Sequence, residues 1–244
     1  MDLGKIRQYL RRTAWGAFPD VVICANEPVA TRHPLYAEAK IGDPKAADGL
    51  IEDVLSTVPT GLLNQILGTR RPRLLAVHAV EAAGMNAIPR VFARRLAQQF
   101  DLHLETGIVQ INRVTHTKAD GYHRLALPAV FDGAVRATDY VLVDDFVGQG
   151  GTFANLRGHV EAQGGRVTGA ISLAGKTRSS QLRPNQSTLQ KLREKHGNQL
   201  EEWWISTFGY GLDRLTESEA GYLFRSDDFV TITARIAAAR RTGN

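Results

Sequence analysis

The middle of the chain alternates between short apolar runs and longer amphipathic stretches. The apolar runs predict buried strands at 21–25, 73–78, 107–114, 140–143 and 166–174. Stretches at 35–55, 89–100 and 153–162 repeat their apolar residues with the helical period, which predicts helices with one buried face. Because strands that alternate with helices form parallel sheets covered by helices, we predict an α/β fold with a parallel sheet flanked by helices.

The two ends of the chain have a mostly helical pattern. A short helix is predicted over 2–15, and further helices at 187–196, 200–208, 217–224 and 227–240. We divide the chain into an N-terminal helical or hood segment packed on the core (1–72), an α/β core (73–186) and a helical C-terminal extension (187–244). Nothing in the first segment indicates chemistry beyond packing. The aromatic residues of the extension are interpreted as core in preference to a base-stacking hood: Trp203, Trp204, Phe208 and Tyr210.

One strand-loop-helix junction combines the features of an anion site. The strand runs into Asp144 and Asp145, and three glycines lie within 148–151, before Thr152 and a predicted helix. The first N–H groups of a helix have no intrahelical partner, and glycines let the backbone close around a phosphate. The carboxylates cannot bind that phosphate, so they indicate hydroxyl groups, a metal ion or both beside it. A phosphate next to a polyol indicates a sugar phosphate.

Two better-known phosphate loops do not match this junction. A P-loop requires a lysine, and none is present here. The dinucleotide fingerprint begins at Gly148 and Gly150, but Phe153 stands where its third glycine belongs. The junction instead resembles the motif by which type I phosphoribosyltransferases bind 5-phosphoribosyl 1-diphosphate (PRPP): apolar residues, two acids, a short spacer and Thr-Gly-Gly-Thr. Gln149 replaces the first threonine of that motif.

The resemblance, which covers about residues 73–178, implies a type I phosphoribosyltransferase-like fold and specific roles. Asp144 and Asp145 would form the catalytic pair that binds the ribose hydroxyls. Mg²⁺ would be carried by PRPP, without a direct protein ligand. The departure at Gln149 leaves open whether backbone groups alone hold the phosphate or whether the phosphate is placed differently. The implied 5-phosphate site consists of Gly148, Gln149, Gly150, Gly151 and Thr152.

Two further loops match the family in position. The loop after the strand 73–78 resembles the one that binds diphosphate, although a plain strand-to-helix connection would look the same. Its residues are Glu81, Ala82, Ala83 and Gly84. Lys176, just past the strand 166–174, resembles a lysine that contacts the base in the purine-specific branch of the family. A solvated loop lysine is an equally good interpretation, so Lys176 is only a candidate acceptor contact.

The polar segment 115–124 lies where the family has a mobile lid. A lid closes over the diphosphate and excludes water. The resemblance implies diphosphate contacts from Lys118, His123 and Arg124, with a solvated hairpin as the alternative. Zinc is not expected, because His116 and His123 lack acidic companions at ligand spacing.

The composition limits which partners and which cellular compartment we expect. With 244 residues, 43% of them hydrophobic, the chain suffices for one large α/β domain with an appendage. A net charge of +5 and a pI of about 9.5 suit a polyanionic substrate. They also suit nucleic acid, but no arginine-rich tail or basic-aromatic repeat favours it. One cysteine, Cys24, allows no internal disulfide, and no apolar run reaches membrane-span length, so we expect a cytoplasmic protein without a membrane partner. A homodimer is compatible with the sequence.

The activity implied is transfer of 5-phosphoribosyl from PRPP to a small-molecule nitrogen nucleophile, a nucleobase in the simplest case, with release of diphosphate. The acid pair and the lid favour an enzyme over a PRPP- or nucleotide-sensing regulator of the same fold. A third interpretation runs the chemistry in reverse, as cleavage of a nucleotide or nucleoside. The sequence does not select a purine, a pyrimidine or another acceptor.

Overall fold

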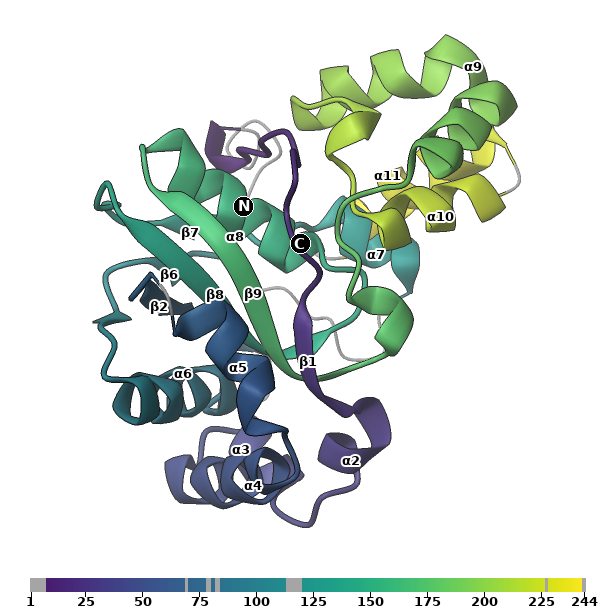
Figure 1. The fold of residues 1–244 in the computed structure, drawn as a ribbon. Helices are drawn as coiled ribbons and strands as arrows, with labels where there is room; N and C mark the ends of the chain where they lie inside the picture. The colour runs from purple at the N-terminus through teal and green to yellow at the C-terminus, as the bar shows by residue number, and fades with distance from the viewer. Residues whose placement is uncertain are drawn as a thin grey trace.

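A computed structural model describes residues 8–68, 70–77, 80–81, 84–112, 120–226 and 228–242. At its centre lies a five-stranded sheet with the order β1-β9-β8-β2-β5, in which every neighbouring pair is parallel (Figure 1). The predicted parallel sheet with flanking helices is therefore confirmed. The strands are β1 (Val22–Asn26), β2 (Arg73–Ala76), β5 (Leu104–Glu105), β8 (Asp139–Val147) and β9 (Arg166–Gly175).

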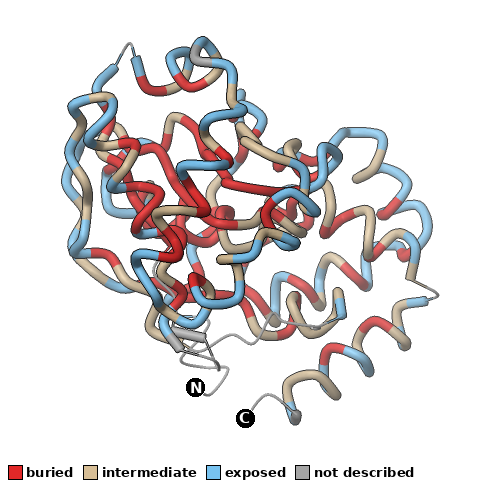
Figure 2. Tube along the Cα trace, turned by 90° about the horizontal axis from the view of Figure 1, so that it is seen from below, coloured by how far each residue is buried: buried red, intermediate tan, exposed pale blue. Residues whose placement is uncertain are grey.

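The strand β8 shows why helices cover both faces of the sheet. Tyr140 and Leu142 belong to one core cluster and Val141 and Val143 to another, because successive side chains of a strand point to opposite faces. The first cluster includes α8 (Gly151–Ala162); the second includes α4 (Pro44–Ser56), α5 (Thr60–Leu67) and α6 (Ile88–Phe100). In Figure 2 the buried residues accordingly concentrate in the middle of the molecule. Burial on both faces explains the continuous apolar run of this strand.

Short elements complete the core. The predicted strand over 107–114 is wrong in extent for the described residues 107–112, of which only Val109–Gln110 (β6) form a strand. This strand pairs antiparallel with β7 (Phe131–Asp132), outside the parallel sheet. The strand beside β2 is β5, whose two residues are too few to show a periodic pattern. The remaining elements are α2 (Glu27–Thr31), α3 (Tyr36–Lys40), β3 (Val80–Glu81), β4 (Gly84–Met85), α7 (Gly121–Ala126) and the 3₁₀ turn η1 (Thr177–Ser179).

The residues before β1 form a non-helical segment with a turn at 16–17, which we call the N-terminal strap (residues 10–20). The predicted helix over 2–15 is wrong for residues 10–15, which have no helical structure. The strap crosses α8 so closely that a Cβ on Gly158 would lie 1.2 Å from the carbonyl oxygen of Arg11. Trp15 and Phe18 bury their rings in the cluster beneath it. The apolar residues that imitate a helix face are therefore anchors of a strap.

The C-terminal extension has a core of its own. Its elements are α9 (Gln186–Phe208), which bends at Gly197 (φ 63°), the 3₁₀ turn η2 (Leu212–Arg214), α10 (Glu217–Arg225) and α11 (Phe229–Thr242). Trp204 and Phe208 are fully buried in it, so their interpretation as core is confirmed. The same cluster includes Leu125 and Ala126 of α7, and Figure 1 shows the extension packed on that helix beside the sheet. No helix among the described residues is long and apolar enough to cross a membrane.

Candidate active site

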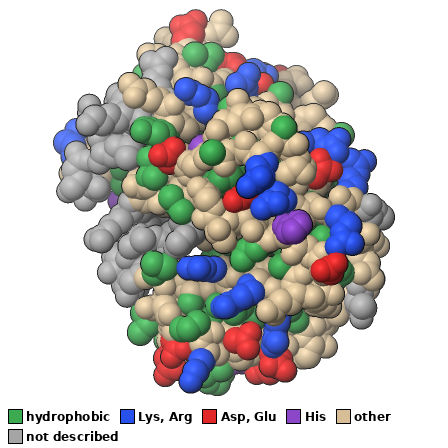
Figure 3. All heavy atoms as spheres, turned by 90° about the vertical axis from the view of Figure 1, so that its left-hand side faces the viewer, with side chains coloured by type: hydrophobic (Ala, Val, Ile, Leu, Met, Phe, Trp, Pro, Cys, Tyr) green, Lys and Arg blue, Asp and Glu red, His purple; other side chains and the backbone are tan. Residues whose placement is uncertain are grey.

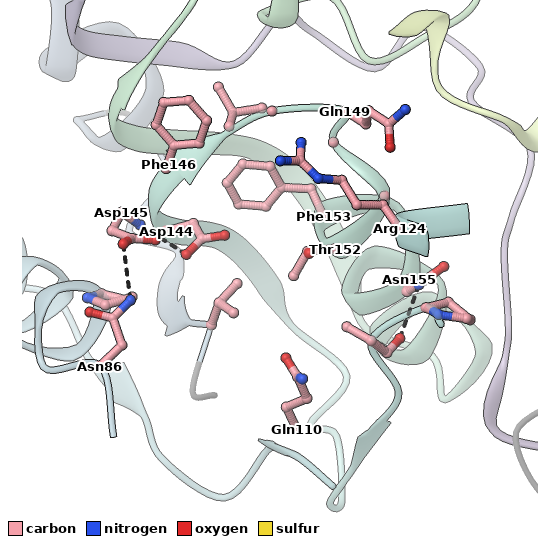
Figure 4. A pocket seen from close by; sticks show the side chains of 18 of the residues that line it. Asn86, Gln110, Arg124, Asp144, Asp145, Phe146, Gln149, Thr152, Phe153 and Asn155 are labelled. Atoms are coloured by element: carbon pink, nitrogen blue, oxygen red, sulfur yellow. Dashed lines mark hydrogen bonds between the residues drawn. The ribbon is translucent and has the colours of Figure 1, made fainter. Parts of the chain in front are cut away.

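A cavity of about 380 Å³ opens at the carboxyl end of β8 (Figure 4). Its volume is of the size that small ligands occupy. The end of β8 and the loop into α8 form one wall, and helices α2 and α3 form another. Residues of α7, of the N-terminal strap and of the C-terminal extension also reach it. We refer to this space as the β8 cavity.

The two predicted acids both line the β8 cavity, and both are nearly buried, Asp144 with 7% and Asp145 with 8% of its surface exposed. Asp145 Oδ2 accepts hydrogen bonds from Lys40 Nζ at 2.7 Å and from Asn86 Nδ2 at 2.9 Å. Asp144 Oδ1 accepts the backbone N–H of Asp145 at 2.8 Å. Figure 4 shows the pair beside Asn86 at the edge of the cavity. One cation therefore pairs with only one of the two acids.

This arrangement separates the two acids chemically. Burial raises the pKa of Asp144 well above its ordinary value, and repulsion by the Asp145 carboxylate raises it further. Burial acts on Asp145 in the same direction, but the charge of Lys40 and the hydrogen bonds from Lys40 and Asn86 outweigh it, so the pKa of Asp145 is lowered. Asp144 therefore keeps its proton to a higher pH than Asp145 does, and while the pair holds one proton it can both donate and accept hydrogen bonds.

The glycine loop, residues 148–152, turns the chain from β8 into α8. Gly150 has a φ of +80°, which favours glycine, and its carbonyl accepts the Ala154 N–H at 3.0 Å to begin the helix. Within the described part of the chain, the N–H groups of residues 148–152 donate to no protein acceptor. The loop lines the β8 cavity, where Thr152 also lies. An anion placed there would receive several backbone hydrogen bonds.

Gln149, which differs from the family motif, has its backbone held by a residue outside the glycine loop. Its carbonyl oxygen accepts a hydrogen bond from Thr216 Oγ1 at 2.5 Å. Its side-chain Oε1 is buried and has no hydrogen-bond partner among the described residues. The backbone of Gln149 is therefore anchored to the C-terminal extension, while its side chain retains an unused acceptor at the cavity.

Of the three residues predicted to contact the diphosphate from a lid, only Arg124 lines the cavity in the described part of the chain. Arg124, on α7, lines the β8 cavity, and its Nη1 lies 2.9 Å from the position that a Cβ on Gly148 would take. Arg124 Nε is buried without a hydrogen-bond partner among the described residues. His123 is not among the residues that line the cavity; its backbone N–H donates to Asp120 Oδ1. Lys118 lies outside the described residues.

The expected diphosphate loop is described only at its two ends. Glu81 in β3 and Gly84 in β4 pair with each other across a two-stranded hairpin. Ala82 and Ala83 lie outside the described residues. Asn86, the residue directly after the hairpin, donates a hydrogen bond from its side-chain amide to Asp145. The connection after β2 therefore contributes the side-chain amide of Asn86 to the site, a residue that was not predicted from the sequence.

Lys176 lies at the carboxyl end of β9, as expected, but is not among the described residues that line the β8 cavity. Its Nζ is 3.3 Å from Glu27 Oε2. Glu27, on α2, does line the cavity. Lys176 therefore pairs with a residue that lines the cavity, and a direct contact of Lys176 with the acceptor remains a prediction.

Two groups of site residues were missed by sequence reasoning. Segment 1–72, in which the sequence indicates no chemistry beyond packing, also reaches the cavity: Tyr36 and Lys40 line it, and Lys40 donates a hydrogen bond to Asp145. Arg12 of the strap also lines it, donating to Asn155 Oδ1 at 2.7 Å and to Glu219 Oε2 at 2.6 Å. Burial disfavours the Arg12 charge, but Glu219 outweighs it and the pKa of Arg12 is raised. No local pattern distinguishes these residues from ordinary helix or strap positions.

Charged residues on the molecular surface do not gather on the face seen in Figure 3. Lys and Arg side chains there are interspersed with Asp and Glu. A nucleic-acid footprint would be a continuous basic stripe. This face therefore gives no support to a nucleic-acid partner.

Comparison with known sequences gives two curated relatives and no matching family model. The chain is 41% identical over 230 residues to Protein TraN of Escherichia coli, a match that covers 94% of this chain and 51% of that protein. It is 38% identical over 151 residues to an uncharacterized protein of Haemophilus influenzae, covering 61% of this chain and 34% of that protein. The chain thus spans about half the length, or less, of these relatives, and their names state no activity.

Comparison with solved structures gives phosphoribosyltransferases at low similarity. Adenine phosphoribosyltransferase from Thermoanaerobacter pseudethanolicus is 18% identical with a TM-score of 0.31, covering 72% of this chain and 100% of that one. The Leishmania donovani enzyme is 15% identical with a TM-score of 0.28 (71% and 79%). Orotate phosphoribosyltransferase from Mycobacterium tuberculosis is 12% identical with a TM-score of 0.26 (71% and 93%). These scores are too low to carry an argument, so the fold rests on the strand order and directions given above.

Proposed function

We propose that the protein transfers the 5-phosphoribosyl group of PRPP to a nitrogen nucleophile, a nucleobase in the simplest case, and releases diphosphate. One observation carries the proposal: a buried acid pair and a loop of unpaired amides line the same cavity at the end of one strand. These two features complement two parts of one molecule, the ribose diol and the 5-phosphate.

The glycine loop would hold the sugar in place. Its N–H groups and the Thr152 hydroxyl bind the 5-phosphate, and the N-terminus of α8 adds partial positive charge. Fixing the phosphate also fixes the anomeric carbon relative to the acid pair. Positioning of this kind supplies a large part of the rate when two reactants must meet.

The acid pair would act on the ribose. Asp145, held as a carboxylate by Lys40 and Asn86, accepts a hydrogen bond from one hydroxyl, and the protonated Asp144 donates to its neighbour. As the bond from the anomeric carbon to diphosphate breaks, positive charge develops on the sugar ring. A buried carboxylate stabilises that charge more effectively than water does. The nitrogen of the acceptor then bonds to the anomeric carbon, and its proton is taken up by the released diphosphate.

The leaving diphosphate gains negative charge and needs cations. Arg124 is a cation that lines the cavity, opposite the acid pair in Figure 4. The described residues contain no group of three or more His, Cys, Asp or Glu side chains that could hold a metal ion. In this proposal Mg²⁺ would come with the substrate, since Mg²⁺ favours substrate phosphates over an all-protein cage. When bound, Mg²⁺ would neutralise charge on the diphosphate.

The direct test is release of diphosphate from PRPP with Mg²⁺, measured with and without a panel of purine and pyrimidine bases. We expect release that depends on one class of base, with the matching nucleotide formed in equal amount. Release of ribose 5-phosphate without any base would indicate hydrolysis instead. Binding of PRPP with no release under any condition would contradict the transferase and support a sensor.

A further inference from the structure

The C-terminal extension touches the glycine loop at one defined point. Thr216, the residue before α10, donates its hydroxyl hydrogen to the carbonyl oxygen of Gln149 at 2.5 Å. Thr216 is fully buried, and a Cβ on Gly150 would lie 3.5 Å from its methyl carbon. The two residues are 67 positions apart in the chain. A contact between such distant segments, placed on an anion-binding loop, calls for a physical reason.

The geometry of the peptide bond supplies that reason. No peptide bond among the described residues is cis, so the C=O of Gln149 and the N–H of Gly150 point in opposite directions. Holding the carbonyl toward Thr216 therefore turns the Gly150 N–H away from the extension. This N–H has no protein acceptor within the described part of the chain, and Gly150 lines the β8 cavity. A peptide with φ of +80° at glycine could otherwise flip at little cost.

The hydroxyl of Thr216 is itself held by a chain of hydrogen bonds. Its Oγ1 accepts the N–H of Glu219 at 3.1 Å, and Glu219 Oε2 accepts the N–H of Thr216 at 2.9 Å, which makes a capping box. Because the oxygen accepts from the helix, its hydrogen is free to point at Gln149. Glu219 in turn binds Arg12 through both carboxylate oxygens, at 2.6 and 2.9 Å. The strap, α10 and the glycine loop are thus linked in one network.

We infer that Thr216 is a positioning residue for the anion site: it orients the Gln149–Gly150 peptide so that the Gly150 N–H faces the bound phosphate. This inference rests on the proposed function, because it assumes that the loop binds a phosphate. It gives the C-terminal extension a role in the site. It also accounts for the loop holding its shape although Gln149 replaces the threonine of the family motif.

The test measures binding of inorganic phosphate and of ribose 5-phosphate to the 244-residue chain by calorimetry. Thr216→Val removes the donor and keeps the shape, and we expect both affinities to fall roughly three- to tenfold, the effect of one hydrogen bond. Thr216→Ser keeps the hydroxyl and should restore them. Thr216→Gly also loses the donor and should bind as weakly as Thr216→Val, although removing a fully buried side chain should lower its unfolding temperature.

A matched control separates positioning from general loosening of the extension. Asp228 caps α11 by accepting the N–H of Thr231 at 2.6 Å, so Asp228→Ala removes a cap in the same extension. We expect Asp228→Ala to lower the unfolding temperature without changing either affinity. The amide resonance of Gly150 should move on phosphate addition in the wild type and move less in Thr216→Val.

The two proposals fail in different ways. If the wild type binds neither inorganic phosphate nor ribose 5-phosphate, the anion site itself is refuted and the proposed function with it. If the wild type binds them and both Thr216→Val and Thr216→Gly bind equally well, the positioning role is refuted while the anion site stands. Equal weakening in Asp228→Ala would also overturn the positioning role.

Discussion

Replacing Asp145 with asparagine removes one negative charge and keeps the shape of the side chain. In the structure this carboxylate is 8% exposed and receives hydrogen bonds from Lys40 and Asn86. We expect Asp145→Asn to lower turnover at least about 100-fold, roughly 2.7 kcal/mol of transition-state stabilisation, because the positive charge on the sugar would lose its buried counter-charge. Substrate binding should change less, since the 5-phosphate contacts are untouched.

The fold should survive this change. The Lys40 side chain is 24% exposed, so it can be rehydrated when its partner loses charge, and we expect a loss of stability of about 1 kcal/mol. The variant should also lower the pKa of Asp144, because repulsion by Asp145 contributes to raising it. Its residual activity should therefore show a shifted pH profile.

The assay compares diphosphate release by the wild type, Asp145→Asn and Asp139→Asn. Asp139 lies at the opposite end of β8 and pairs with Arg166 at 2.7 Å, so it is a carboxylate on the same strand outside the cavity. Circular dichroism and thermal unfolding establish that each variant is folded. A folded Asp145→Asn with wild-type turnover would refute the role of the acid pair, whereas an inactive Asp139→Asn would show that the assay reports on the fold.

Three further changes probe other parts of the site. Gly150→Ala should lower the free energy of unfolding by roughly 2–5 kcal/mol, because φ at this position is +80° and the added Cβ would lie 2.3 Å from Leu182 Cδ2. Denaturant unfolding measures this loss, and a midpoint equal to that of the wild type would contradict the loop geometry. Lys40→Met removes the main charge that lowers the pKa of Asp145, so as the pH falls the activity should be lost at a higher pH than in the wild type. An unchanged acid limb of the pH–rate profile would show that the Lys40–Asp145 pair does not control the activity. Arg124→Gln should lower diphosphate release about ten- to 100-fold; an unchanged steady-state rate would remove this cation from the mechanism.

The parts of the fold that sequence reasoning reached are those with a strong local pattern. Strand β8 is buried on both faces and reads as a continuous apolar run, and the glycines that follow it mark the turn into α8. The aromatic residues Trp204 and Phe208 recur at helical spacing because they fill one core. In each case a short stretch of sequence carries the whole signal.

The parts that it did not reach depend on distant partners. Lys40 meets Asp145 across 105 positions, and nothing in α3 distinguishes this lysine from a surface residue. Arg12 meets Glu219 across 207 positions. The apolar residues of the strap are spaced like those of a helix, so its sequence pattern predicts a helix. Tertiary packing gives the strap a different conformation. Strand β5 has only two residues, too few for any period to appear.

The central claim is that the amides of residues 148–152 bind the phosphate of a phosphorylated pentose whose hydroxyls meet Asp144 and Asp145. The most direct measurement is a titration of the isotopically labelled protein with ribose 5-phosphate, with ribose alone as the control, followed through backbone amide resonances. We predict saturable shifts of the loop amides and of Asp145 with ribose 5-phosphate, and no loop shifts with ribose at the same concentrations. Loop amides that stay unmoved while ribose 5-phosphate binds elsewhere, or does not bind, would contradict the claim.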